Sequence, residues 1–518
     1  MMTDQIQALC TDRLLQVTQN PDVPEFWHLL VAAVLALPQD LQPEWVTQVS
    51  AIASGSYREQ WLKASALCFL SKDQLRWRAL LELLDKRVGL EAGMQALQLI
   101  WLDSLKGSLG SKQMAERLDA VGTVAAQMKV AAMLVGGRPR IQSIAYLSAP
   151  RRIAIYTPQI ASMRHGGTAL TMHILGALAK LGCSLRVFTG QEPHVAMAEQ
   201  LNGAGAYIIK QAMEAATLVI NSSETFQVKV PDLKLSLGYR LAVTQKTLDD
   251  FDPDLVVFVG FLSPLACRLY ERYPIVGLSI HAMPPIVPLD SWLAPLKNTP
   301  AQQTLPGLPE PVAIPFTQRF WPTPKPIALS RTSLGIAQKH TVLLTTGSRL
   351  TEEIKEPWLL FMLDFLNSRS DCCWVIVGVT AERVPNWATG RPAIHFVGPQ
   401  LDLMPWIAMA DIYVNPQRVG GGTTVANAME RGVPVLSFSD GDGGDKVGKF
   451  AVVDMESYFA QLANWVDKPK EREAVAAALQ ERFHAVFSLA HPSVEENLRL
   501  ACMTAMQSFA RRTRKSDA

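Results

Sequence analysis

Apolar residues in the first 147 positions recur at helical spacing, and the strict alternation typical of strands is missing. Leu80, Leu81, Leu84 and Val88 illustrate the pattern. Residues three and four positions apart share one face of a helix. Clusters of glycine and proline at 20–24, 38–43 and 53–56 divide the region into helices of ordinary length. The pattern predicts an all-helical domain over 1–147, and either oligomerisation or docking of another molecule is compatible with it.

The pattern changes at Arg151, where short β-type runs begin to alternate with amphipathic helices. One such helix starts near Thr168, and Gly182 follows its last turn. Strands and helices alternating at this spacing predict a parallel, doubly wound sheet over 148–325. The predicted strands of this domain are 152–157, 184–189, 207–209, 218–220, 255–259 and 275–280.

Prolines are frequent from Pro284 to Pro326, and strand signals fade there. This segment is predicted to connect two sheets as a hinge. Alternation then restarts and predicts a second doubly wound domain over 326–490, so the fold class is α/β with two Rossmann-like domains after a helical one. A C-terminal helix with a basic, solvated tail is expected over 491–518. The predicted strands of the second domain are 341–346, 374–377, 394–397, 412–414 and 433–438.

Composition narrows the classes of partner and compartment. The chain has 518 residues, 48% hydrophobic and 19% charged, with 49 basic and 47 acidic residues. A formal charge of +2 favours neither nucleic acid nor an anionic membrane surface as main partner. Seven cysteines without a C-x-x-C pattern indicate free thiols in a reducing compartment. We find no secretory signal, and the apolar run 29–37 is too short for a transmembrane segment. A soluble, cytoplasmic protein is therefore expected.

A glycine run lies between two predicted strands of the second domain. Gly420, Gly421 and Gly422 are followed by Thr423 and Thr424, and then by a short helix in which Val425, Ala428 and Met429 face inward. Either threonine is expected to cap this helix, whose amino end favours an anion such as phosphate. Gly432 stands where a C-terminal cap is expected. An ordinary glycine-rich turn is the alternative to a diphosphate cradle.

Two cations follow the first strand of the second domain. Arg349 and Lys355 come after strand 341–346, and Pro357 is expected to begin the next helix. In open α/β sheets, ligands bind outside the carboxyl ends of the strands. Both cations are therefore predicted to face the glycine run and to neutralise a diphosphate by charge-assisted hydrogen bonds.

An acidic stretch, Asp440-Gly-Asp442-Gly-Gly-Asp445, invites comparison with metal sites. A calcium loop needs glycine at its sixth position and glutamate at its twelfth, where this chain has Asp445 and Ala451. We therefore predict no metal site and interpret the stretch as a flexible loop beside the predicted diphosphate cradle.

These residues resemble a known family, the glycosyltransferases of the GT-B fold, over about 150–490. Gly422-Thr423-Thr424, then Asn427, then Gly432-Val433-Pro434 are similar to motifs of the O-GlcNAc transferase branch, which includes the bacterial enzymes that N-glycosylate adhesins. By resemblance, Lys355 matches the donor-phosphate lysine and His281 matches the histidine of a Gly-His-Pro motif. The branch has aspartate where Asn427 stands, contacting the nucleotide ribose. Related retaining families have two glutamates at the places of Val419 and Asn427.

The resemblance implies an inverting, metal-independent transfer of a sugar from a nucleotide sugar, most simply a UDP-sugar, to a protein or glycan acceptor, without a cofactor. His281 is the first candidate for the catalytic base and His165 the second. Gly166 and Gly167 would let the donor or acceptor approach the first sheet. Gly398, Pro399 and Gln400 are expected to contact the nucleotide base. The helical domain is then a candidate for acceptor docking. A nucleotide-sugar epimerase of the same architecture and a non-catalytic binding protein remain alternatives.

Overall fold

The computed structural model describes residues 2–70, 83, 90–91, 93–94, 149–161, 166–193, 217–220, 224–279, 284–294, 308–327, 329–347, 349–380, 384–385, 387, 390–418 and 420–516. The chain forms two compact units. The first contains residues 1–103 and 110–317 and the C-terminal segment 492–518, and the second contains 318–491 together with 104–109. The predicted strand 207–209 lies outside the described residues.

The first unit begins with four helices, as the helical spacing predicted. They are α1 (Met2–Gln19), α2 (Pro24–Leu35), α3 (Gln42–Ala51) and α4 (Tyr57–Leu70). Trp27, Leu30 and Val34 of α2 lie at helical spacing and are buried in a core that these helices share. Trp61 and Cys68 of α4 instead join the core of the first sheet. The last helix of this bundle therefore connects the helical region with the sheet.

The first sheet has eight strands in the order β3-β4-β2-β1-β5-β6-β7-β8. All neighbours are parallel except β3 and β4, which pair antiparallel at one edge. The strands are β1 (Arg152–Thr157), β2 (Ser184–Thr189), β3 (Thr217–Ile220), β4 (Glu224–Lys229), β5 (Leu255–Val259), β6 (Ile275–Leu278), β7 (Ser291–Ala294) and β8 (Val312–Pro315).

The prediction that residues 284–326 only connect the two sheets is wrong. β7 and β8 lie inside this proline-rich segment and extend the first sheet in parallel register. Each has only four residues, which is too short for a hydrophobic period to be recognised in the sequence. Pro315 is the last residue of the edge strand β8, a place where proline removes no ladder hydrogen bond.

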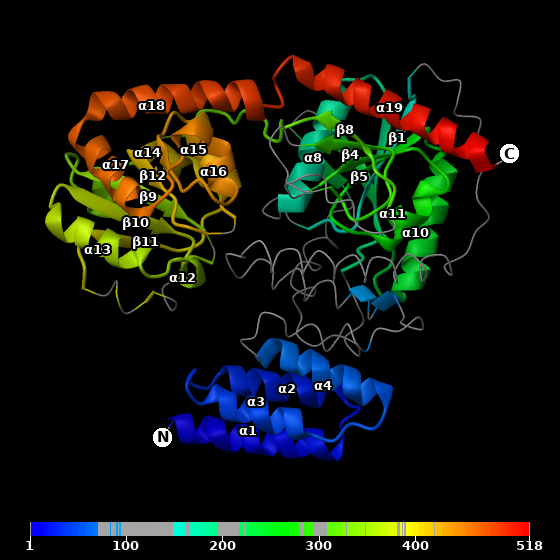
Figure 1. The fold of residues 1–518 in the computed structure, drawn as a ribbon, viewed down its shortest axis with the longest axis horizontal. Helices are drawn as coiled ribbons and strands as arrows, with labels where there is room; N and C mark the ends of the chain where they lie inside the picture. The colour runs from blue at the N-terminus through cyan, green and yellow to red at the C-terminus, as the bar shows by residue number, and fades with distance from the viewer. Residues whose placement is uncertain are drawn as a thin grey trace. The chain divides into compact units, whose positions relative to one another are not determined.

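The long C-terminal helix α19 (Ser493–Ser516) belongs to the first unit, where it contacts β5 to β8 and α8 (Gly166–Ala179) (Figure 1). Its basic end is not wholly solvated, contrary to the expectation for the tail. The Arg512 guanidinium lies 3.7 Å from the centre of the Tyr270 ring and forms an ion pair with the buried Asp290 at 3.0 Å. Within the described part of this unit, the other helices of the sheet are α10 (Leu237–Phe251) and α11 (Pro264–Tyr270).

The second unit has a five-stranded, all-parallel sheet in the order β11-β10-β9-β12-β13. The strands are β9 (Thr341–Thr346), β10 (Cys372–Val377), β11 (Ile394–Val397), β12 (Ile412–Val414) and β13 (Val435–Leu436). Its helices are α12 (Leu350–Glu353), α13 (Trp358–Ser368), α14 (Met404–Met409), α15 (Gly422–Glu430), α16 (Asp442–Val447), α17 (Met455–Asp467) and α18 (Pro469–Arg482), the last followed by a π-helical turn (Phe483–Phe487). Short 3-10 turns are η2 (Arg331–Leu334) and η5 (Gly448–Phe450).

Helices cover both faces of this sheet, as the doubly wound prediction requires. Trp374 and Ile376 of β10 pack in one core with α13 and α17, whereas Cys373 and Val375 pack in the other with α14, α15 and α18. Successive side chains of a strand point to opposite faces, so a strand buried on both sides becomes a continuous apolar run. This explains why Cys372–Val377 is buried along its whole length.

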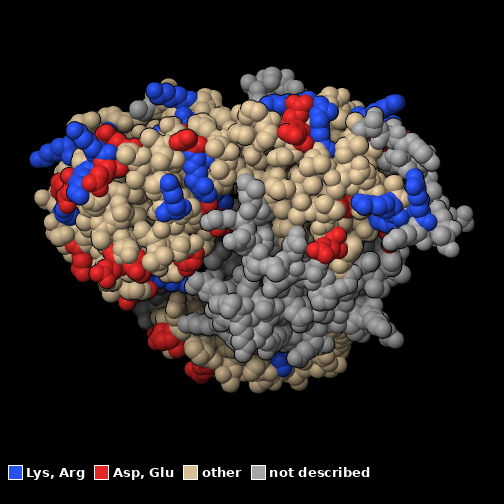
Figure 2. Space-filling view, turned by 45° about the horizontal axis from the view of Figure 1, so that its top comes forward, with Lys and Arg blue, Asp and Glu red and all other residues tan. Residues whose placement is uncertain are grey.

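All seven cysteines are free, as expected, and all except Cys183 are buried. Burial raises the pKa of the Cys372 thiol to about 12 and that of the Cys373 thiol to about 11, so both pack as small apolar groups. On the face drawn in Figure 2, basic and acidic side chains are interspersed instead of gathering in one basic surface. No helix within the described residues is both long and apolar enough to cross a membrane.

Candidate functional site

The second sheet has a topological switch point between β9 and β12. The chain proceeds from β9 to β10 and β11 on one side and returns to β12 and β13 on the other. Ligands of open α/β sheets bind in the crevice outside the carboxyl ends of the strands at such a point. The loops that leave it contain Gly347 and Arg349 after β9, and Asn415 to Gly421 after β12. The glycine run and Arg349 were both singled out in the sequence. They lie in loops that leave the same edge of the sheet, after the adjacent strands β12 and β9.

The glycine run has the backbone that only glycine adopts without strain. Gly420 and Gly421 have φ angles of 105° and 81°, and Gly421 immediately precedes α15. The predicted threonine cap is wrong, because the N-cap is Gly421 and makes no side-chain cap bond. Thr424 instead donates to the Gly421 carbonyl at 2.9 Å from within the helix. The first-turn amides of α15 have no intrahelical acceptor, which makes this end suitable for an anion.

Arg349 lies against the glycine run, and Lys355 does not contact it among the described residues. A Cβ placed on Gly420 would be 3.2 Å from Nη2 of Arg349, so this guanidinium lies close to the backbone of the glycine run. Arg349 also pairs with Glu353 at 2.8 Å while remaining 43% exposed, which leaves its guanidinium accessible to a ligand. Lys355 is exposed just before α13, which begins at Trp358, one residue later than predicted, with Pro357 as its N-cap.

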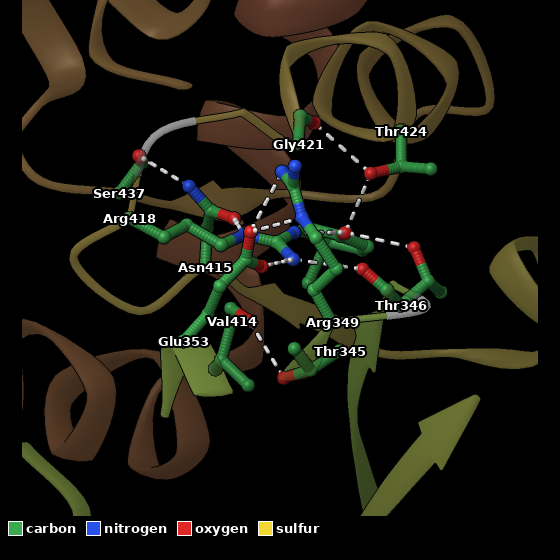
Figure 3. A network of polar contacts seen from close by, with 11 residues as sticks. Thr345, Thr346, Arg349, Glu353, Val414, Asn415, Arg418, Gly421, Thr424 and Ser437 are labelled. Carbon is green, nitrogen blue, oxygen red and sulfur yellow. Dashed lines mark hydrogen bonds and ion pairs between the residues drawn. The ribbon is translucent and has the colours of Figure 1, made fainter. Parts of the chain in front are cut away.

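Sequence reasoning missed Arg418, whose buried side chain is the centre of this site (Figure 3). Its Nε donates to Asn415 at 2.9 Å, and its Nη1 donates to the Thr346 carbonyl at 3.0 Å and to Glu353 at 3.2 Å. Its Nη2 donates to the Tyr413 hydroxyl at 3.3 Å. Arg418 therefore joins the ends of β9 and β12, and its guanidinium lies against Gly421 of the glycine run. The available signal was an arginine between a buried strand and a glycine run.

Glu353 is the acidic partner of both arginines. Its side chain, 12% exposed, pairs with Arg349 through Oε1 and with Arg418 through Oε2. Arg349 and Arg418 place two guanidinium groups against Glu353, and Asp442 lies against Gly422 at the first turn of α15. A diphosphate would meet the guanidinium of Arg349 and the free amides of the helix together.

The buried Tyr458 stabilises the loop that follows β12. Burial raises the pKa of Tyr458 well above its ordinary value, so the phenol stays protonated and donates to the Asn415 carbonyl at 3.2 Å. The Asn415 amide donates to the Ser437 hydroxyl at 3.1 Å. These bonds fix the loop after β12 before any ligand binds, which is the preorganisation that an anion site requires.

The acidic stretch 440–445 is not the flexible loop predicted from the sequence, because α16 begins at Asp442. Because Gly443 and Gly444 have no side chain, this helix packs closely against the segment that follows β13. A Cβ on Gly443 would be 2.4 Å from the Ser437 hydroxyl, and one on Gly444 would be 2.4 Å from the carbonyl of Phe438. The described residues contain no group of three or more potential metal ligands.

The remaining predicted residues lie in different parts of the chain. Gly398, Pro399 and Gln400 follow the edge strand β11, and Asn427 is half-buried on α15. Gly166 and Gly167 are the first residues of α8 in the first unit, rather than a loop before it. His281 and His165 lie outside the described residues.

Comparison with known proteins adds an independent finding. Residues 340–481, which include the whole site, match the family model described as glycosyl transferases group 1. The structure is similar to a mutant O-GlcNAc transferase of Thermobaculum terrenum, with a TM-score of 0.58 and 14% identity, over 98% of this chain and 95% of that one. A HepE protein of Anabaena, solved with UDP-glucose, gives a TM-score of 0.45 at 15% identity, over 67% of this chain and 99% of that one. No curated protein matches the sequence.

The domain matched over residues 340–481 and the overall fold support placing this protein among the glycosyltransferases of the GT-B fold. Within that class, the fold resembles that of the O-GlcNAc transferase branch, as the sequence motifs indicated. At 14% identity the structural likeness concerns the fold alone, and the activity rests on the matched domain.

Proposed function

We propose that this chain transfers a sugar from a UDP-sugar to a protein or glycan acceptor with inversion at the anomeric carbon. The observation that carries the proposal is the contact of Arg349 with the glycine run at the amino end of α15, at the switch point of the second sheet. That arrangement supplies positive charge and free amides where a leaving diphosphate gains negative charge. The names of the O-GlcNAc transferase and of the UDP-glucose complex agree with a nucleotide-sugar donor.

In the proposed mechanism, the acceptor nucleophile attacks the anomeric carbon while the diphosphate departs. Arg349 and the amides of Gly421 to Thr424 hold the diphosphate, and Lys355 adds a second cation. His281 takes the proton from the nucleophile. Asn427 binds the ribose, and the loop 398–400 contacts the base. Val419 and Asn427 stand at the places of the glutamate pair of retaining families, which disfavours a retaining mechanism of that type and supports inversion. The same charges replace a metal ion at the diphosphate.

Arg349→Ala is expected to weaken binding of UDP about 10- to 100-fold, because it removes a charge-assisted interaction with the diphosphate. Isothermal titration with UDP measures this directly. Lys470→Ala, which removes an exposed cation on α18, is the matched control and should bind UDP as the wild type does. Wild-type affinity in Arg349→Ala would remove the diphosphate from this site.

Lys355→Ala is expected to reduce UDP release from the donor while UDP binding stays detectable.

His281→Ala is expected to lower kcat about 10²- to 10⁴-fold with donor affinity nearly unchanged, the range for losing a general base. Mass spectrometry of candidate acceptors, incubated with a panel of nucleotide sugars, identifies the substrate pair, and nucleotide release then gives kcat. Wild-type kcat in His281→Ala would transfer the role of base to another group, with His165→Ala as the next variant.

A further inference from the structure

The carboxyl edge of the first sheet contains a buried acidic residue that the proposed mechanism does not use. Glu192 follows β2 and is fully buried. The strand order β2-β1-β5 places the switch point of this sheet between β1 and β5, so the loops after these strands border the expected ligand crevice. Glu192 lies where those loops meet.

Glu192 holds all three loops. Its backbone N–H donates to the Pro158 carbonyl, in the loop after β1, at 2.8 Å. Its Oε1 accepts from the Tyr156 hydroxyl on β1 and from the Ser263 hydroxyl, in the loop after β5, at 2.6 Å. A Cβ on Gly260 would be 2.8 Å from Pro158, so the loops after β1 and β5 are also in direct contact.

The preceding residue, Gln191, has a strained backbone. Its φ is 46°, in the left-handed region that non-glycine residues seldom adopt. Its side chain donates to the Ile160 carbonyl at 2.8 Å, and its carbonyl accepts from Arg240 of α10 at 2.8 Å. Strain of this kind persists where the surroundings determine the conformation, and it concentrates at functional sites.

The loop held by Gln191 and Glu192 leads to the start of α8. The Ala161 amide donates to the Thr168 hydroxyl at 2.9 Å, and Thr171 donates to the Gly167 carbonyl at 2.8 Å. Gln191, next to Glu192, bonds Ile160, and Ala161 bonds Thr168. The loop at Glu192 is thereby linked to the first turn of α8, where Gly166 and Gly167 lie, the glycines predicted to face the substrates.

We propose that Glu192 is a positioning residue for the acceptor side of the transfer reaction, joining the loops after β1, β2 and β5 and thereby fixing the amino end of α8. Glu192 is buried and touches no substrate, so it acts through these loops and not on the reacting atoms. The proposal rests on the proposed function, which takes the base that deprotonates the acceptor, His281, from the first unit and the diphosphate site from the second. The arrangement of the loops itself rests on the contacts above.

The protonation of Glu192 gives an independent readout. Burial raises the pKa of its carboxyl from 4.5 to about 7, against the opposing effects of its hydrogen bonds with Ser263 and Tyr156, the charge of Arg240 and the Leu265 amide. The charged and titratable groups around it are Tyr156 on β1 and Arg240 on α10, with Glu91 acting on Arg240. Because the folded protein holds this proton more tightly than the unfolded chain, the stabilising contribution of Glu192 falls as pH rises from 4.5 to about 7 and is constant above.

The kinetic test compares Glu192→Gln with Glu192→Ala, using Asp250→Ala, an exposed carboxylate on α10, as control. Glutamine keeps an oxygen that accepts from Tyr156 and Ser263, so Glu192→Gln should transfer sugar with nearly wild-type KM. Glu192→Ala should raise the acceptor KM about tenfold or more, since misplaced loops cost positioning, while UDP affinity stays unchanged. An unchanged acceptor KM in folded Glu192→Ala, or an equal loss of UDP affinity, would overturn the proposal.

Two measurements keep the proposal testable if the wild type transfers no sugar, which would refute the proposed function alone. Hydrogen exchange of peptides covering 158–161 and 260–263 should accelerate in Glu192→Ala and not in Glu192→Gln, with β9 unchanged. The Tm of the wild type relative to Glu192→Gln should fall between pH 4.5 and 7 and level off above. Wild-type exchange in Glu192→Ala would refute the role of Glu192 in fixing these loops, and a pH-independent Tm difference would refute its protonation.

Discussion

Gly421→Ala is expected to disrupt the donor site. The residue has a φ of 81°, where an alanine costs about 1–2 kcal/mol. Its Cβ would also lie 2.4 Å from Nη2 of Arg418. That guanidinium is held by Asn415, Thr346, Glu353 and Tyr413, so the backbone of the glycine run must move instead. We expect UDP affinity to fall at least about tenfold as the amides of α15 lose their orientation.

Gly335→Ala is a control that separates the effect of backbone strain from that of the steric conflict with Arg418. Gly335 has a similar φ of 72° in the same unit, but nothing lies within 4 Å of an added Cβ. This control should lose about 1 kcal/mol of stability and bind UDP as the wild type does. Titration with UDP measures both variants. If Gly421→Ala and Gly335→Ala bind UDP equally well, the glycine run does not form the diphosphate site.

Arg418→Met is expected to destabilise the second unit by about 3–5 kcal/mol, the cost of removing one partner of a buried ion pair. The Arg418 side chain is 2% exposed, and its loss leaves Glu353 with only the more exposed Arg349 and leaves the Thr346 carbonyl and Asn415 without their donor. Hydrogen exchange of peptides from β9 and β12 reports the free energy of opening for this unit.

A double-mutant cycle tests whether Arg418 and Glu353 act as a pair. In the variant that combines Arg418→Met with Glu353→Gln, the loss should be clearly smaller than the sum of the single losses, because no unpaired buried charge remains. The exposed pair of Arg499 and Glu495 on α19 is the matched control, and Arg499→Met should cost no more than about 1 kcal/mol. Additive losses at 418 and 353 would show that Arg418 is held mainly by its carbonyl and hydroxyl acceptors.

The sequence predicted most strands but missed β4, β7 and β8. The difference between the two groups shows which strands can be recognised from sequence alone. Strands buried on both faces, such as β1, β9 and β10, leave continuous apolar runs that require no knowledge of their neighbours. The missed strands lack such a run: β7 and β8 have four residues each, β4 contains several polar residues, and β8 is an edge strand that ends in proline. They become strands by pairing with a sheet that already exists. Their conformation is a property of the partner as much as of their own residues.

The sequence by itself determined the alternation of helices and strands, the two sheets, the glycine run and its closing Gly432, since each depends on local periodicity or backbone freedom. Only the tertiary structure decided which charges are buried. Arg418 and Glu192 look like ordinary surface residues in the sequence, and their burial is decided by loops from strands distant in the chain. Whether a polar group is buried depends on the elements that surround it, and packing alone brings those elements together.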